Sequence, residues 1–231
     1  MKKIRAGRSK RFTALRSKIN PDTLYPLAEA IALAKETSTT KFDASIEAHI
    51  RTFIDTKKSD QQMRGTLSLP HGTGKKIRIA VIVSDDKVKE LKDCGADIVG
   101  GTELIDKISK TQKTDFDVVL TTPNFMPSIA KLAKILGPKG LMPNPKTETV
   151  TPNIEKMVAE LSKGKVSYKT DDTGNIHFTI GKASFDDTKL VENFTAVIDG
   201  LRKAKPEGVK GSLIKSINIS SSMGPGIKVA V

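Results

Sequence analysis

The stretch IRIAVIV, residues 77–83, is a nearly unbroken run of apolar and β-branched side chains. Such a run is typical of a strand buried on both faces, as in a parallel sheet covered by helices. Downstream the pattern alternates, with amphipathic helices expected near residues 86–92, 103–109, 128–136 and 153–162 and strands near 96–99 and 118–121. Alternating strands and helices predict a parallel sheet with helices on its faces. We therefore expect residues 70–159 to form a small Rossmann-like domain.

The segments on either side of this middle piece follow other patterns. Residues 45–54 alternate apolar and polar side chains, which predicts an antiparallel strand with one face in solvent. The other expected elements are a helix near 24–37 with Pro26 in its first turn, a hairpin of strands 166–169 and 175–180, a helix over 187–203 with Asp186 as its cap, and strands 214–220 and 227–231. Neither flank alone has enough elements to bury a sheet face, but the two together do.

The predicted fold class is therefore α/β with two domains. Residues 1–69 and 160–231 would form a split α+β sandwich domain from both termini, and the Rossmann-like domain at 70–159 would be inserted into it. The Pro-His-Gly-Thr-Gly stretch that begins at Pro70 marks the first crossing between them. Two linkers, near residues 68–72 and 157–163, would connect the domains as a hinge.

The charge of the chain points to a polyanionic partner. Its 231 residues include 39 Lys and Arg against 26 Asp and Glu, a net charge of +13, and 37% hydrophobic residues, enough for ordinary cores. The two outer pieces carry 25 basic and 15 acidic side chains, and the middle piece carries 14 and 11. Nucleic acid is the commonest partner of such a surplus. An anionic membrane is the rival, but no apolar run approaches the roughly 18 residues of a spanning helix.

The amino terminus is expected to be a basic arm. It has eight Lys and Arg residues up to Lys18 and no acidic residue before Asp22. It lacks the apolar stretch of a secretory signal; an organelle transit peptide has a similar composition, but an arm that touches phosphates fits better. The single cysteine, Cys94, excludes a disulfide framework and a cysteine-based metal site, and favours a reducing, cytoplasmic compartment.

No motif in the sequence indicates catalysis, a metal site or a cofactor. Residues 72–75, GTGK, resemble a phosphate loop but precede a strand, which favours an interdomain turn. His49, His71 and His177 lie in different expected elements, without carboxylates or thiols at ligand spacing. The alternative is a nucleotide-dependent enzyme built on the middle domain, but it would need a glycine-rich loop where residues 84–86, SDD, follow the first strand. A DNA-architectural protein would need groove wedges or a basic reading helix, and the sequence has neither.

Structured RNA is the favoured partner. Ten aromatic residues and no Trp argue against the stacked platforms of single-strand readers, whereas contact through backbone shape, hydroxyls and phosphates suits folded RNA. Residues 220–226, SSSMGPG, lie between two expected strands and would let RNA approach the backbone closely, although a flexible hairpin loop explains them equally well. Phe42, which follows Lys41 at the start of a strand, is either a core residue or a contact at the loop edge.

Several motifs, in order along the chain, resemble the ribosomal protein L1 family of the large subunit. They are residues 41–43 (KFD), 59–65 (SDQQMRG), 69–75 (LPHGTGK), 95–101 (GADIVGG), 137–146 (GPKGLMPNPK), 180–185 (IGKASF) and 222–225 (SMGP). The resemblance implies a split RNA-binding domain with an inserted Rossmann-like domain, and a structural, non-enzymatic role without a cofactor or a homo-oligomer. It also implies binding to a hairpin region of 23S-type rRNA, a mobile stalk that assists release of exit-site tRNA, repression of the protein's own mRNA, and a place in the cytoplasmic ribosome.

The same resemblance implies a set of RNA contacts. They fall on Phe42, Ser216, Ser222, Met223 and Gly224, with Lys41, Lys169 and Pro225 as neighbours. Two positions depart from the family pattern. Ser222 stands where the family usually has Thr, which keeps the hydroxyl but loses a methyl group. Asp172 stands where the family usually has a basic residue, which is expected to weaken phosphate contacts nearby.

Overall fold

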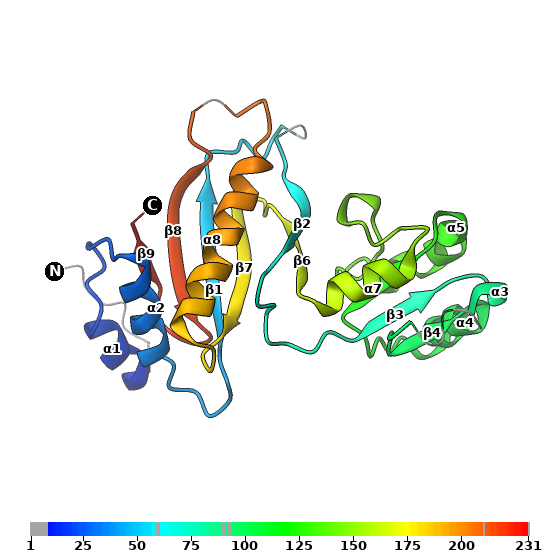
Figure 1. Ribbon diagram of the computed structural model, residues 1–231, viewed down its shortest axis with the longest axis horizontal. Coiled ribbons are helices and arrows are strands. Elements are labelled where there is room, and N and C mark those ends of the chain that lie inside the picture. The colour runs from blue at the N-terminus through cyan, green and yellow to red at the C-terminus, as the bar shows by residue number, and fades with distance from the viewer. Residues whose placement is uncertain (1–8, 59–60, 89–90, 92–93, 210, 231) are drawn as a thin grey trace. The chain divides into compact units, whose positions relative to one another are not determined.

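The computed structural model describes residues 9–58, 61–88, 91, 94–209 and 211–230, and the chain forms two compact units (Figure 1). The outer unit comprises Met1–Met63, Leu69–Gly74 and Tyr168–Val231, and the middle unit comprises Arg64–Ser68 and Lys75–Ser167. The first four cations of the expected basic arm, up to Arg8, lie outside the described residues. The described part of that arm is helix α1, Lys10–Ser17, where the Ser9 hydroxyl accepts a capping hydrogen bond from the Phe12 N–H at 3.3 Å.

A four-stranded antiparallel sheet in the order β7-β1-β8-β9 is the centre of the outer unit. Its strands are β1 (Ser45–Thr52), β7 (Asn175–Lys182), β8 (Ile214–Ser221) and β9 (Ile227–Val229). Along β1 the buried residues are Ile46, Ala48, Ile50 and Thr52, every second position. The sheet therefore has one covered face and one face accessible to solvent, as the period of two in the sequence predicted.

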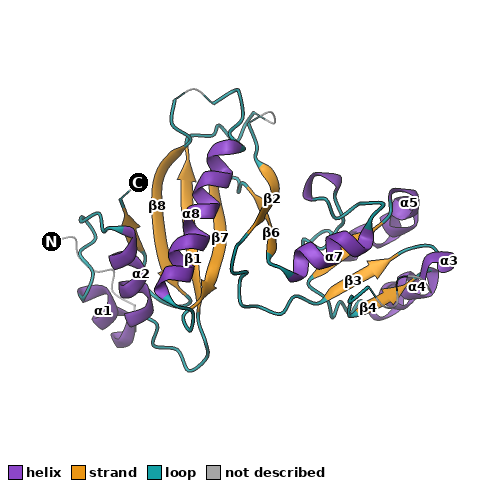
Figure 2. Cartoon of the chain, in the orientation of Figure 1, coloured by secondary structure: helices purple, strands orange, loops and turns teal. Residues whose placement is uncertain are grey.

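Two helices cover the buried face of this sheet, α2 (Leu27–Glu36) and α8 (Asp187–Lys203) (Figure 2). Helix α8 has the predicted bounds, with Asp186 in the cap position. Helix α2 begins later than expected, because Tyr25 is still extended and pairs with the edge of the sheet. Its N–H donates to the Lys228 carbonyl at 3.0 Å and its carbonyl accepts from the Ala230 N–H at 2.9 Å. Pro26 is therefore the cap residue rather than part of the first turn.

The predicted hairpin of strands 166–169 and 175–180 is wrong, although its turn exists. Strand β6 (Lys165–Lys169) pairs with β2 (Arg64–Ser68) in a separate two-stranded sheet, whereas β7 pairs with β1. After β6 the Thr170 N–H donates to the Met63 carbonyl at 2.9 Å, so the chain is still paired with the earlier segment when the turn begins. An apolar pattern identifies a strand but does not identify the strand with which it pairs.

The middle unit contains a three-stranded parallel sheet in the order β4-β3-β5, which confirms the predicted α/β fold class. Strand β3 (Ile79–Ile82) is central and fully buried, between β4 (Ile98–Gly100) and β5 (Val118–Thr121). Alternate β3 side chains enter different clusters. Ile79 and Val81 belong to the cluster that includes α7, and Ala80 and Ile82 to the one that includes α4.

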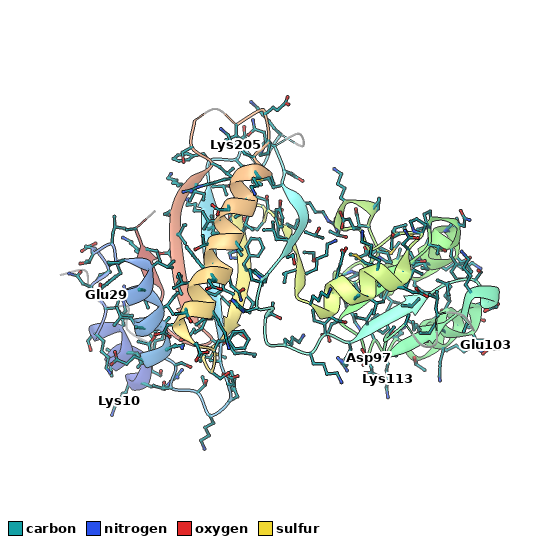
Figure 3. All side chains as sticks on the ribbon, viewed as in Figure 1. Lys10, Glu29, Asp97, Glu103, Lys113 and Lys205 are labelled. Carbon is teal, nitrogen blue, oxygen red and sulfur yellow. The ribbon has the colours of Figure 1, made fainter. Side chains whose placement is uncertain are left out.

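The helices of the middle unit include α3 (Asp85–Val88), α4 (Thr102–Thr111) and α7 (Ile154–Ser162). The single helix predicted near 128–136 is instead a series of short turns, α5 (Met126–Ile129), a 3-10 turn (Ala130–Leu132) and α6 (Ala133–Leu136). Pro127 within α5 has no N–H to give to a regular helix. Charged side chains of both signs surround this unit, among them Asp97, Glu103 and Lys113 (Figure 3).

Helix α7 is part of the middle unit, which corrects the linker expected near residues 157–163. Met157, Val158 and Leu161 are at most 6% exposed and belong to the same core cluster as β3. The second crossing consequently lies after Ser167, and not at residue 159. The first crossing, Leu69–Gly74, is held on the outer unit by Asn193 of α8, which accepts from the His71 N–H at 3.0 Å and donates to the Gly72 carbonyl at 2.9 Å.

Candidate RNA interface

The uncovered face of the outer sheet is a polar surface, called the open face below. Strand pairing brings ten side chains onto it, because the side chains of paired residues point to the same side. They are Asn175, His177 and Thr179 from β7, Glu47, His49 and Arg51 from β1, Ser216, Asn218 and Ser220 from β8, and Lys228 from β9. Hydroxyl, amide and imidazole groups are those with which proteins hydrogen-bond the sugars and phosphates of folded RNA.

The loop after β8 lies at one end of the open face and has an unusual backbone. Met223 has a φ of 62° and a side chain that is 70% exposed. The Gly224 N–H donates to the Ser221 carbonyl at 2.8 Å, and a Cβ atom on Gly224 would come within 2.3 Å of Ser221 Oγ, so a side chain here would force the Ser221 hydroxyl to move. A left-handed conformation costs a residue with a side chain roughly 1–2 kcal/mol. Strain of this kind concentrates at functional sites, and here it projects Met223 into solvent.

Ser222 joins this loop to the beginning of β1. Its N–H donates to the Ser45 carbonyl at 2.9 Å, and its hydroxyl accepts from the Ser45 N–H at 3.2 Å. Beneath it, the buried Ser221 hydroxyl has no hydrogen-bond partner in the part of the chain that the structure describes. Pro225 is buried. The Ser222 hydroxyl, predicted as an RNA contact, therefore also has a structural role.

The loop before β1 lies at the same end. Phe42 is 58% exposed, which excludes the interpretation of this ring as a core residue, and Lys41 is exposed beside it. Arg11 of α1 links the two loops, since its guanidinium donates to Thr39 Oγ1 at 2.9 Å and to the Met223 carbonyl at 3.4 Å. Six of the predicted contacts are thus gathered at one end of the sheet. We call them the end cluster: Lys41, Phe42, Ser222, Met223, Gly224 and Pro225.

The other two predicted contacts lie elsewhere. Ser216 is on the open face, but it pairs with Arg51, five residues along the strand from the pair of Ile46 with Ser221. At about 3.4 Å per residue this is roughly 17 Å from the end cluster. Lys169 is exposed at the end of β6, outside the four-stranded sheet.

The open face also contains a histidine pair that the sequence did not predict. His49 and His177 are opposite each other on β1 and β7, with their Nδ1 atoms 2.9 Å apart, and His49 Nε2 lies 3.0 Å from Ser220 Oγ. Burial and the neighbouring His177 lower the pKa of His49, while Glu47 acts in the opposite direction. In the neutral pair one ring nitrogen donates to the other. Only the pairing of β1 with β7, 128 residues apart, could have revealed it.

The turn between β6 and β7 presents carboxylates. Asp171 accepts hydrogen bonds from the N–H groups of Asn175 at 2.6 Å and Thr173 at 2.9 Å. Burial alone would raise the pKa of Asp171, but these hydrogen bonds hold it well below its ordinary value. Asp172 is exposed in the same turn. Carboxylates in this turn would repel a phosphate, and the weaker phosphate contacts expected from Asp172 stay a prediction.

The middle unit does not offer a phosphate site after its first strand. Asp85 is the first residue of α3, and its carboxylate reaches the start of α4, where it accepts from the Thr102 N–H at 3.3 Å and from the Thr102 hydroxyl at 3.1 Å. A carboxylate there repels the phosphate that a helix N-terminus would otherwise attract. Residues 72–75 form a turn with Gly72 and Gly74 at positive φ, as predicted.

Metal and membrane sites are not found in the described part of the chain. No group of three or more His, Cys, Asp or Glu side chains among those residues is placed to hold a metal ion. Among the same residues, no helix combines the length and the apolar character needed to cross a membrane.

Comparison with known proteins agrees with the motifs. The sequence model of the ribosomal protein L1p/L10e family matches residues 34–225 of this chain. Three proteins named large ribosomal subunit protein uL1 are similar to this chain over 96% of its length. The protein of Mycoplasma capricolum is 52% identical, that of Fervidobacterium nodosum 50% and that of Streptomyces avermitilis 49%. The matched regions cover 97%, 94% and 92% of these three proteins, respectively. This chain therefore belongs to the ribosomal protein L1p/L10e family, whose members are structural ribosomal components and not enzymes.

Proposed function

We propose that this protein is a constituent of the large ribosomal subunit and binds a hairpin region of the 23S-type rRNA through its outer unit. The observation that carries the proposal is the end cluster. Its strained loop holds Met223 70% exposed, at the same end of the polar sheet face as the exposed Phe42, in a protein of net charge +13. The protein acts in the cytoplasmic ribosome.

The chemistry of the end cluster suits a folded RNA. Phe42 and Met223 offer apolar surface to a sugar or a base, and Gly224 lets the RNA backbone come close because it has no side chain. Hydroxyl and amide groups on the open face recognise 2′-hydroxyls and phosphates, as proteins do in the shallow groove of RNA helices. Lys41 and the basic amino-terminal arm add attraction to the phosphates that does not depend on the RNA sequence.

Three further roles follow from the family resemblance. The outer unit would act as the discontinuous RNA-binding domain, and the middle unit would be the part of a mobile stalk that assists release of tRNA from the exit site. The protein would also repress translation of its own mRNA by binding a hairpin similar to that in rRNA. Because one surface would serve both RNAs, the rRNA would compete with the mRNA.

A substitution at Met223 separates binding from folding. Met223→Gly removes the exposed side chain and relieves the left-handed strain, so its free energy of unfolding should stay within about 1 kcal/mol of the wild type. Its affinity for an rRNA fragment that contains the hairpin should fall about tenfold or more, because burial of a methionine side chain is worth roughly 1.5–3 kcal/mol. Both quantities are measured on one preparation, by urea unfolding and by filter binding.

Gln112→Gly is the matched control. Gln112 ends α4 in the middle unit with a φ of 54°, close to the 62° of Met223. The control relieves the same backbone strain away from the end cluster, and it should bind the rRNA fragment as the wild type does. Full affinity of the Met223→Gly protein would remove the end cluster from the RNA site.

A further inference from the structure

Phe53 is an exposed aromatic ring at the end of the open face that lies away from the end cluster. Leu24, Phe42, Phe53 and Met223 are the large hydrophobic side chains found exposed among the described residues. Two of them belong to the end cluster. Phe53 is 54% exposed and follows β1 directly, so it lies beyond Arg51 and Ser216.

The backbone directs this ring to the open face. Thr52 and Ile54, on either side of it, are buried, and the Phe53 N–H donates to the Leu213 carbonyl at 2.9 Å. Strand alternation therefore places Phe53 on the same side as Arg51.

A β-bulge brings a cation to the ring. Arg51 pairs with Ser216 and Thr52 pairs with Ile214, so Lys215 is an extra residue on β8. Bulges re-aim side chains in this way. The Lys215 Nζ lies 5.5 Å from the centre of the Phe53 ring, a cation–π distance.

We propose that Phe53 and Lys215 form a second RNA contact, which receives an unpaired nucleotide of the same RNA that binds the end cluster. The ring offers a stacking surface to a base, and the ammonium group of Lys215 lies where it can contact the adjoining phosphate. Ser216 adds a hydroxyl for the ribose on the same face. The nucleotide must be unpaired to stack on Phe53, because the bases of a duplex are already stacked on one another and cannot reach a side chain.

The proposal rests on the proposed function and extends it along the sheet. Lys215 is six residues from Ser221 and Phe53 is seven residues from Ile46, so the two sites would be roughly 20–24 Å apart along the strands, a distance that a folded RNA hairpin with a bulge or loop can span.

The carboxylates of Asp171 and Asp172 adjoin β7 at this end of the sheet, whereas Lys215 is on β8, on the other side of β1, and Arg51 is on the same face. The positive charge around Phe53 favours RNA over an apolar protein segment as the occupant of this site. A site of this kind would add affinity without changing the contacts at the end cluster.

The experiment uses the absence of tryptophan from the chain. In the Phe53→Trp protein the single indole reports its own surroundings, and a base stacked on it quenches its fluorescence. The probe is the rRNA fragment used with Met223→Gly. The control is Thr195→Trp, at an exposed position on α8, which covers the opposite face of the sheet. RNA should quench the emission of the Phe53→Trp protein strongly, and that of the control only by the absorption of light by the RNA.

Affinity gives the second readout. Phe53→Ala should weaken binding of the fragment about 5- to 150-fold, the range for loss of one base–aromatic stack. If that variant does not fold, the conservative Phe53→Trp protein still decides the question. The proposal is overturned if the indole is quenched no more than in the control, or if a folded Phe53→Ala protein binds with full affinity.

The two proposals fail in distinguishable ways. If Met223→Gly binds weakly while the Phe53 variants behave as the wild type, the second contact is absent and the proposed function stands. If Met223→Gly binds with full affinity, the end cluster is not the RNA site, whatever the Phe53 variants do.

Discussion

Met223 and Ser222 are neighbours that serve different purposes. The Met223 side chain makes little contact within the outer unit and is held outward at a cost in backbone energy, whereas the Ser222 hydroxyl is hydrogen-bonded to Ser45 at the start of β1. Loss of the Ser222 hydroxyl would therefore disturb the loop as well as any RNA contact. A Ser222→Thr substitution would keep both hydrogen-bonding functions of the hydroxyl.

The histidine pair makes stability depend on pH in the weakly acidic range. The pKa of His49 is lowered from its ordinary value of 6.5, so the unfolded chain binds a proton at a higher pH than the native protein does. His49 therefore makes its full contribution to the free energy of unfolding above pH 6.5. This contribution is lost as the pH falls through the pKa of His49 in the native protein. The difference between the free energies of unfolding in urea at pH 7.5 and pH 5.5 should therefore be smaller for His49→Gln than for the wild type.

His177→Gln is the companion variant. It removes one of the two causes that lower the pKa of His49 and leaves the other, burial. The dependence on pH should weaken without vanishing. A His49→Gln protein that keeps the whole wild-type difference would show that other groups produce it.

Among the elements, α8 holds the first crossing of the chain through one buried amide. Asn193 is fully buried, and its side chain hydrogen-bonds the His71 N–H, the Gly72 carbonyl and the Ile180 carbonyl. Asn193→Ala should lower the free energy of unfolding by roughly 2–4 kcal/mol, because backbone groups from two segments lose their partner. Thr195→Ala, on the exposed side of the same helix, should change it by less than about 0.5 kcal/mol. Urea unfolding of both variants gives the comparison, and equal losses would refute an anchoring role for Asn193.

Most of the elements could be predicted from the sequence because each has a local signal. The β-branched run of β3, the alternation along β1 and the periodicity of α8 each reflect which side chains are buried in that element alone. The partner of β6 could not be predicted, since the sequence between residues 165 and 182 is compatible with a hairpin. It is the hydrogen bond of Thr170 to Met63, 107 residues earlier, that continues the pairing with the β2 segment.

The candidate site was predictable only in part, for the same reason. The loop at residues 220–226 has a distinctive composition, and the family motifs add Phe42. The bridge from Arg11 to both loops and the pair of His49 with His177 depend on contacts between distant segments. No local pattern carries that information. From the sequence alone, Phe53 is one of the solvent-facing residues of the alternating segment 45–54, and nothing marks it as a binding residue.

At the scale of the whole molecule, RNA binding and the middle unit should be separable. The outer pieces of the sequence hold most of the surplus charge, with 25 basic against 15 acidic side chains, and they contain every residue of the end cluster. The middle unit has its own sheet and its own buried clusters on both faces. Residues 69–74 should remain with the outer unit in any dissection, because Asn193 holds them there.

A protein in which a flexible Gly/Ser linker of about eight residues replaces residues 75–163 should therefore keep its affinity for the rRNA fragment within about threefold, or roughly 0.7 kcal/mol. The replacement spares β2 and β6, and it removes α7 as a whole, so that Leu161 is not left exposed. Circular dichroism and a cooperative thermal transition establish first that the shortened chain folds. The separate fragment of residues 75–163 should bind the same RNA far more weakly at equal salt concentration. Comparable binding by that fragment, or a large loss of affinity in a folded shortened chain, would place the main RNA contact in the middle unit, because the end cluster is intact in one protein and missing from the other.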